Sequence, residues 1–94
     1  MKYIDWDKVK NQKLISERNI SFEEVKIAVN EGRVLDDFEN QNKKRYPNQR
    51  IMVIEIDNYA YYVPYVQDGE KLFLKTIFPS RKATKKYLTR GKKL

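Results

Sequence analysis

A serine followed by two cations, Ser80-Arg81-Lys82, lies near the C-terminus of the chain. Ser80 is a typical helix N-cap, so we expect a helix from Arg81 to about Thr89. The free N–H groups and the dipole of a helix N-terminus attract phosphate, whereas each cation there costs about 0.3–1 kcal/mol. Arg81 and Lys82 are therefore predicted to contact a phosphate group. The alternative is that both side chains reach into solvent or pair with an acid.

A second set of candidates lies between residues 43 and 50, where four cations stand beside a tyrosine and two amides. Cations contact phosphates and an aromatic ring stacks on an unpaired base, so the segment suits single-stranded nucleic acid. The alternative is an ordinary solvated loop. The RNA-binding candidates in this segment are Lys43, Lys44, Tyr46 and Arg50.

The charge is unevenly distributed along the 94 residues, which carry a net charge of +7. Residues 1–42 hold 7 Lys and Arg against 9 Asp and Glu, whereas residues 43–94 hold 13 against 4. This asymmetry predicts salt-sensitive attraction to a polyanion such as RNA. Lys85 and Lys86 extend the basic stretch, either as nonspecific phosphate contacts or as charges that keep the protein soluble.

Several chemistries are excluded by missing residue types. The sequence has no cysteine and no histidine, so it lacks thiolate metal sites, disulfides and the usual general base. It has no Walker loop and no dinucleotide-binding fingerprint, and we expect neither a metal nor another cofactor. It also has no signal segment and no run of about 20 apolar residues, so we expect a cytoplasmic protein that does not contact membranes.

Two helices are predicted in the first third of the chain. Asp7 suits the N-cap of a helix that runs to about Arg18, and Asn19 suits its left-handed end. Ser21 and Glu24 have the spacing of a capping box, which predicts a second helix that ends near residue 32.

Four strands are predicted after the helices, at residues 33–38, 51–56, 59–66 and 71–78. Asp57-Asn58 predicts a tight hairpin, and Pro64 predicts an edge strand or a bulge. Strict alternation in the last strand places Leu72, Leu74 and Phe78 on one face, and Lys71, Phe73, Lys75 and Ile77 on the other.

We therefore expect one α+β domain over residues 1–94, with residues 90–94 as a mobile basic tail. In this fold two N-terminal helices pack on a mostly antiparallel sheet of about four strands, and a basic helix follows the sheet.

Several motifs stand at a spacing that one toxin family shares. Trp6-Asp7, Lys10 and Ile20 to Glu24 follow the pattern W-D-x-x-K…H-G-V-S-F-E-E. Ser80 to Lys86 is similar to S-A-R-x-A-x-x-x-E, and Arg45-Tyr46 to the end of E-E-R-Y. The chain thus resembles the BrnT family, whose members have the RelE-like ribonuclease fold. It departs from that family where His-Gly is replaced by Arg18-Asn19 and two glutamates are replaced by Lys43-Lys44.

The resemblance implies a toxin of a type II toxin–antitoxin system, an endoribonuclease that blocks translation by cleaving RNA. It also implies a cognate antitoxin, often a ribbon-helix-helix protein, and a complex of the two that binds operator DNA. RNA cleavage without metal uses the ribose 2′-OH as nucleophile and leaves 5′-OH ends. Arg81, Arg45 and Lys75 are candidates for stabilising the charged phosphorane. Without histidine, the proton transfers would fall to a lysine with a shifted pKa, a tyrosine or Glu55. Lys10 and Arg18 add phosphate contacts from the first helix.

Two other classes of function remain open. One is a noncatalytic module that binds RNA or DNA through the same basic surface. The other is an interaction protein whose basic face binds an acidic partner, for which RNA affinity would be weak and would depend little on salt.

Overall fold

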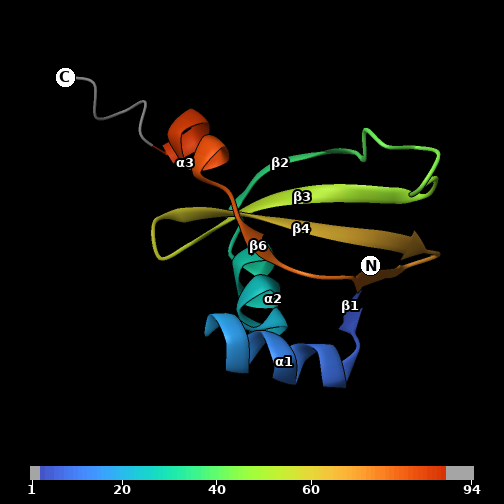
Figure 1. Cartoon of the computed structure of the whole chain (residues 1–94), viewed down its shortest axis with the longest axis horizontal. Helices are drawn as coiled ribbons and strands as arrows, with labels where there is room; N and C mark the ends of the chain where they lie inside the picture. The colour runs from blue at the N-terminus through green and yellow to red at the C-terminus, as the bar shows by residue number, and fades with distance from the viewer. Residues whose placement is uncertain (1–2, 89–94) are drawn as a thin grey trace.

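The computed structural model describes residues 3–88 and consists of a central sheet with helices on both faces (Figure 1). The predicted tail at residues 90–94 lies outside the described residues. In chain order the elements are β1 (Tyr3–Trp6), α1 (Lys8–Arg18), α2 (Phe22–Asn30), β2 (Val34–Glu39), β3 (Gln49–Ile56), β4 (Tyr59–Asp68), β5 (Lys71–Leu74), β6 (Phe78–Pro79) and α3 (Arg81–Leu88). The predicted α+β class is confirmed, with two short strands more than expected. No helix within residues 3–88 is long and apolar enough to cross a membrane.

The two N-terminal helices begin and end as their cap residues predict. Asp7 Oδ1 accepts the Val9 N–H at 2.8 Å, and Asn19 ends α1 with φ 54°. Ser21 and Glu24 form the complete capping box at the start of α2. The local sequence therefore sets both helix starts before any tertiary contact is made.

A buried asparagine joins the two helices. Asn11 is only 4% exposed, and its Oδ1 accepts the Phe22 N–H at 2.7 Å. Its Nδ2 donates to Glu23 at 2.8 Å, and this bond lowers the pKa of the Glu23 carboxyl below its ordinary value. One side chain thus satisfies a buried backbone group of α2 and fixes α2 against α1.

The strand order in the sheet is β1-β5-β4-β3-β2, with β6 paired to β4 beside β5. The strands from β2 to β5 pair antiparallel, whereas β1 lies parallel to β5. Asp57 and Asn58 both have positive φ, 53° and 65°, and form the predicted tight turn between β3 and β4. This topology places the first and the fifth strand side by side, which local sequence patterns do not reveal.

Of the two positions predicted for Pro64, the edge strand is wrong, because β4 is the central strand of the sheet. Its carbonyl accepts the Lys75 N–H at 2.8 Å, so the missing N–H of Pro64 faces the same side, towards β5 and β6. There β4 pairs with β5 at residues 65–68 and with β6 at residues 61–62, and residues 75–77 between the two strands are not in a strand. The proline therefore stands at a gap in the ladder, where no donor is needed.

The last predicted strand is shorter and is followed by a break. Strand β5 ends at Leu74, and the chain joins the sheet again only at Phe78–Pro79 in β6. The alternation predicted across the break is wrong, because Ile77, and not Phe78, is buried in the same core cluster as Leu74. Phe78 is 36% exposed. Phe78 pairs with Tyr62 of β4, its ring contacts the Tyr62 ring, and it lines a hollow together with residues of α3.

Each face of the sheet has its own core cluster. The larger cluster packs under α1 and α2 and includes Phe22, Ile54 and Leu74. The smaller one consists of Val53, Ala60 and Ala83 with partly buried aromatic neighbours, and it lies under α3. The α3 side is thus only partly covered, and it carries the polar and basic groups described next.

Candidate nucleic-acid interface

Helix α3 is fastened to the central strand at its first turn. Ser80 Oγ accepts the Ala83 N–H at 3.0 Å, as predicted for the N-cap. The Ser80 N–H donates to the Ala60 carbonyl at 3.0 Å, and the Ala60 N–H donates to Thr84 Oγ1 at 2.9 Å. Because both backbone groups of Ala60 are used in this way, β4 fixes the position of the α3 N-terminus.

The far end of α3 is tied to strand β2. The Tyr87 hydroxyl donates a hydrogen bond to Asp36 Oδ2. This bond lowers the pKa of the Asp36 carboxyl, and the same bond, with burial adding to it, raises the pKa of Tyr87 to about 12. The two ends of α3 are therefore held by different strands, and a groove lies along the helix.

The α3 groove has a volume of about 660 Å³ and runs between α3, the sheet and the segment after β2. Its aromatic lining residues are Phe38, Tyr62, Phe78 and Tyr87, its amides are Asn40, Gln41 and Asn42, and its cations are Lys82 and Lys86. Asp36, Ile51 and Ala83 complete the lining. Pockets of this size hold small ligands, and the combination of rings, amides and cations suits a nucleotide.

The two lysines of the groove are exposed and stand on successive turns of α3. In the described part of the chain Lys82 has no ion pair. The Lys86 ammonium lies 5.2 Å from the centre of the Tyr87 ring. The acid that lines the groove, Asp36, already accepts the Tyr87 hydroxyl. The charged residues that line the α3 groove are therefore two lysines and one acid.

A second, smaller hollow of about 410 Å³ lies beside the loop that precedes β3. Its lining residues are Tyr46, Pro47, Asn48, Gln49, Val66 and Lys75. The Arg45 guanidinium lies 5.5 Å from the centre of the Tyr46 ring. The structure thus brings Lys75 to the same hollow as Tyr46 and its neighbour Arg45, although Lys75 is far from both in sequence.

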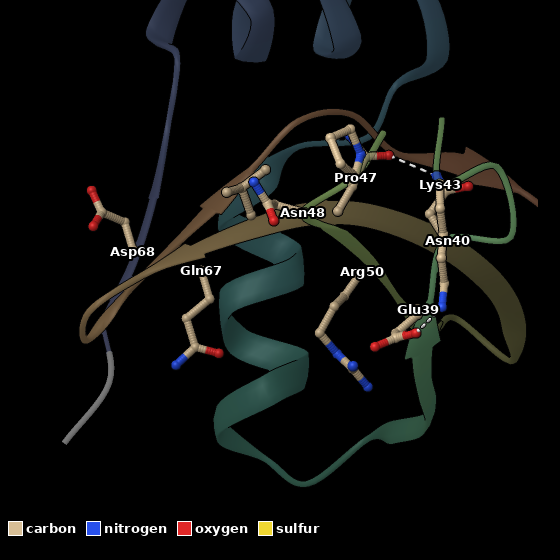
Figure 2. Close-up of a pocket in the computed structure, with 10 residues that line it drawn as sticks. Glu39, Asn40, Lys43, Pro47, Asn48, Arg50, Gln67 and Asp68 are labelled. Carbon is tan, nitrogen blue, oxygen red and sulfur yellow. Dashed lines mark hydrogen bonds and ion pairs between the residues drawn. The ribbon is translucent and has the colours of Figure 1, made fainter. Parts of the chain in front are cut away.

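Two other cations of this segment, Lys43 and Arg50, are paired with acids. Figure 2 shows a polar hollow in which Gln67 and Asp68 lie on one side, Glu39 and Lys43 on the other, and Arg50 between them. The Lys43 ammonium lies 2.8 Å from Glu39 and lowers the pKa of that carboxyl. An exposed pair of this kind can be given up to a phosphate at little cost, so Lys43 remains a candidate.

Arg50 belongs to a network on the α1–α2 face of the sheet. Its Nε donates to Asp37 Oδ1 at 2.8 Å, and the Tyr65 hydroxyl donates to Asp37 Oδ2 at 2.6 Å. Burial, with the bond to Asp37 adding to it, raises the pKa of Tyr65 to about 12. Arg50 therefore has a structural partner, and it does not line the α3 groove.

Neither of the two contacts predicted from α1, Arg18 and Lys10, lines the α3 groove. Arg18 donates to the Ile77 carbonyl at 2.5 Å and lines a small hollow with Tyr61, Phe78 and Pro79. This bond fixes the break between β5 and β6, so a structural role accounts for Arg18. Lys10 is half-buried in the same helix.

The predicted catalytic residues are not gathered in one place. Glu55 accepts the Asn58 N–H at 2.9 Å and stabilises the turn between β3 and β4. Arg81 is exposed at the start of α3, whereas Lys75 lies at the loop hollow. Lys44 and Lys85 are exposed on the loop and on α3. No group of three or more Asp and Glu residues within residues 3–88 is placed to hold a metal ion.

Sequence reasoning missed most of the groove's lining. Phe38, Tyr62 and Phe78 come from three different strands. Asn40 to Asn42 come from the loop after β2, where only the cations are predicted as contacts. The usable signal was the spacing of Ala83 and Tyr87, which places Tyr87 on the inner face of α3.

Compared with known proteins, the chain has no significant match among family models, curated proteins or solved structures. The resemblance to BrnT toxins therefore stays a prediction that rests on the sequence motifs.

Proposed function

We propose that the protein binds single-stranded RNA in the α3 groove and cleaves it, as the toxin of a type II toxin–antitoxin pair in the cytoplasm. The observation that carries the RNA-binding part is the lining of the groove. Aromatic rings offer stacking to an unpaired base, amides offer hydrogen bonds to its edge, and Lys82 and Lys86 offer contacts to phosphate. Each of these groups has a counterpart in a nucleotide.

Cleavage proceeds in this proposal by attack of the ribose 2′-oxygen on the adjacent phosphorus. The 2′-OH gives its proton to water, the P–O5′ bond breaks and a 2′,3′-cyclic phosphate forms. The leaving oxygen takes a proton from water to become a 5′-OH. The dianionic phosphorane is stabilised by cations of α3, for which Arg81, Lys82 and Lys86 are the candidates. Support for this step comes from the motif resemblance. An antitoxin that covers the groove would block the reaction.

A noncatalytic RNA- or DNA-binding module is the second candidate function. It is favoured by the position of Lys75 at the loop hollow, apart from Arg81 at the start of α3. Acid–base work and phosphorane stabilisation need groups within hydrogen-bond reach of one phosphate. Glu55 stands opposite Ala60, which anchors the first turn of α3, but its carboxylate accepts the Asn58 N–H. Such a module needs the groove and its cations but not one particular arginine.

End-labelled RNA incubated with the purified protein separates these functions. Discrete fragments with 5′-OH ends support the nuclease, and protection without cleavage supports the binding module. The matched DNA strand, run in parallel, tells an RNA-specific site from a general one. If neither strand is bound, an acidic protein partner becomes the better account of the basic surface.

Induced expression in bacteria tests the toxin directly. Wild type should arrest growth, whereas Arg81→Ala should not, with Lys26→Ala on α2 as the control that remains toxic. Equal growth of all three strains at equal protein levels contradicts the toxin and leaves the binding module.

A further inference from the structure

The α3 groove and the loop hollow are connected through two residues, both of which also line the polar hollow described above. Asn40 lines the groove and Gln49 lines the loop hollow. The two residues are joined twice, by the Asn40 N–H to the Gln49 carbonyl at 2.9 Å and by Asn40 Nδ2 to Gln49 Oε1 at 3.0 Å. These two hydrogen bonds hold the groove and the loop hollow at a fixed distance from each other.

The two hollows also open on the same face of the sheet. Ile51 lines the groove and Gln49 lines the loop hollow, and these residues stand two positions apart in β3. Residues two apart in a strand point to the same side and are separated by about 7 Å. Val66, which pairs with Gln49 across β3 and β4, lies on this face too. A strand of nucleic acid can therefore pass from one hollow to the other without crossing the sheet.

The loop hollow repeats, on a smaller scale, the chemistry of the groove. Tyr46 is 36% exposed and offers a ring, while Val66 and Pro47 offer apolar contact. Lys75 is exposed and has no ion pair in the described part of the chain, and Arg45 lies against the Tyr46 ring. The Lys75 ammonium lies 5.4 Å from the centre of the Phe73 ring, which fixes it at this end of the sheet.

We infer that the loop hollow is a second nucleotide subsite, which binds the neighbouring nucleotide of the same single-stranded RNA whose first nucleotide occupies the α3 groove. This inference rests on the proposed function and extends it. Tyr46 stacks on the second base, and Lys75 contacts the phosphate that joins the two nucleotides. Lys75 is then a binding residue, in place of the catalytic role that the sequence predicts.

Lys71 provides a matched control for Lys75. Both lysines lie on β5 or directly after it, and both ammonium groups lie near the Phe73 ring, at 5.9 Å and 5.4 Å. Lys71 pairs with Asp68 across β4 and β5, so an acid stands beside it. It lines neither hollow. The inference therefore assigns phosphate binding to Lys75 and not to Lys71.

The experiment measures the binding of fluorescent RNA dinucleotides (the dimer) and hexanucleotides (the hexamer) of randomised base sequence. Their 2′-oxygens are methylated, which prevents cleavage. Wild type should bind the hexamer more tightly than the dimer. Tyr46→Leu should weaken hexamer binding at least about fivefold, as loss of one stacked base implies. Lys75→Ala should make the negative slope of log affinity against log salt less steep by about 0.7, whereas Lys71→Ala should leave the slope unchanged.

Phe78→Leu, in the α3 groove, separates failure of this inference from failure of the proposed function. If Phe78→Leu weakens binding while Tyr46→Leu and Lys75→Ala bind the hexamer as wild type does, the second subsite is wrong and the groove stands. If neither these probes nor unmodified RNA of the same lengths bind wild type, both proposals are wrong. Circular dichroism of each variant shows that a loss of binding is not a loss of folding.

Discussion

The hydroxyl of Tyr87 in α3 donates a hydrogen bond to Asp36 in β2, two residues that stand 51 positions apart in sequence. Strand β2 lies at one edge of the sheet, and α3 is otherwise anchored to the central strand β4 through Ser80 and Thr84. The Tyr87–Asp36 bond thus joins the second half of α3 to β2. It sets the width of the α3 groove, because Asp36 and Tyr87 both line it.

Replacing Tyr87 with Phe should loosen the groove without emptying the core. The ring stays, the bond to Asp36 is lost, and we expect the melting temperature to fall by a few degrees. RNA affinity should fall as well, because Lys82 and Lys86 lose their fixed position. Tyr59→Phe is the matched control, because no hydrogen bond is seen for its hydroxyl in the described residues. Equal RNA affinity in Tyr87→Phe and wild type would contradict this role for the bond.

The two tyrosines that donate to aspartates should make the protein sensitive to alkali. The pKa of Tyr65 and that of Tyr87 are both raised to about 12, from an ordinary value of 10.0. A raised folded-state pKa means that the folded protein holds its protons longer than the unfolded chain. The stability from these bonds is therefore complete below pH 10 and is lost as the pH rises towards 12.

Urea unfolding between pH 9 and pH 12 measures this effect, with the absorbance of tyrosinate as an independent reading. The double variant Tyr65→Phe/Tyr87→Phe should lose less stability over this interval than wild type. An identical decline in both proteins would show that the two tyrosines are not responsible.

Lys82 should contribute to RNA binding through charge alone. Lys82→Ala is expected to lower the slope of log affinity against log salt by about 0.7, the value for one phosphate contact on a single strand. Lys26→Ala, which removes an equal charge from the exposed surface of α2, should leave the slope unchanged. Parallel slopes for Lys82→Ala and wild type, measured over 50–200 mM salt, are incompatible with a phosphate contact at this residue.

Asn11 should matter for stability and not for binding. Asn11→Ala leaves the buried Phe22 N–H without an acceptor, which should lower the free energy of unfolding by about 1–3 kcal/mol. Gln12→Ala, at the exposed neighbouring position, should change it by less than about 0.5 kcal/mol. Urea titration followed by circular dichroism measures both values. If Asn11→Ala lowers the free energy of unfolding as little as Gln12→Ala does, water satisfies the Phe22 N–H in the variant and the predicted role of Asn11 is wrong.

The features that local sequence predicts correctly are those with local causes. The capping box of Ser21 and Glu24 and the turn at Asp57-Asn58 each need only neighbouring residues. The order of the strands in the sheet cannot be predicted in this way, because the parallel pairing of β1 with β5 joins residues nearly 70 positions apart. The central position of Pro64 could not be predicted for a similar reason. A proline is tolerated in this central strand only because β5 and β6 leave a gap opposite it.

The candidate site followed the same division. The cations of the site were visible as a charge excess, and the N-cap at Ser80 placed α3 correctly. The aromatic lining was not visible, because Phe38, Tyr62 and Phe78 meet only once the sheet is assembled. The break before Phe78 also reversed its side, so alternation placed it on the wrong face.

The central claim is that single-stranded RNA occupies the α3 groove, and amide chemical shifts of the folded protein test it most directly. Titration with a short unlabelled RNA, methylated at its 2′-oxygens, should shift the amides of Phe38, Phe78, Lys82 and Lys86, which line the groove. Amides in the middle of α1, on the opposite face of the sheet, should stay in place. Shifts confined to α1 and α2, or none at saturating RNA, would contradict the account.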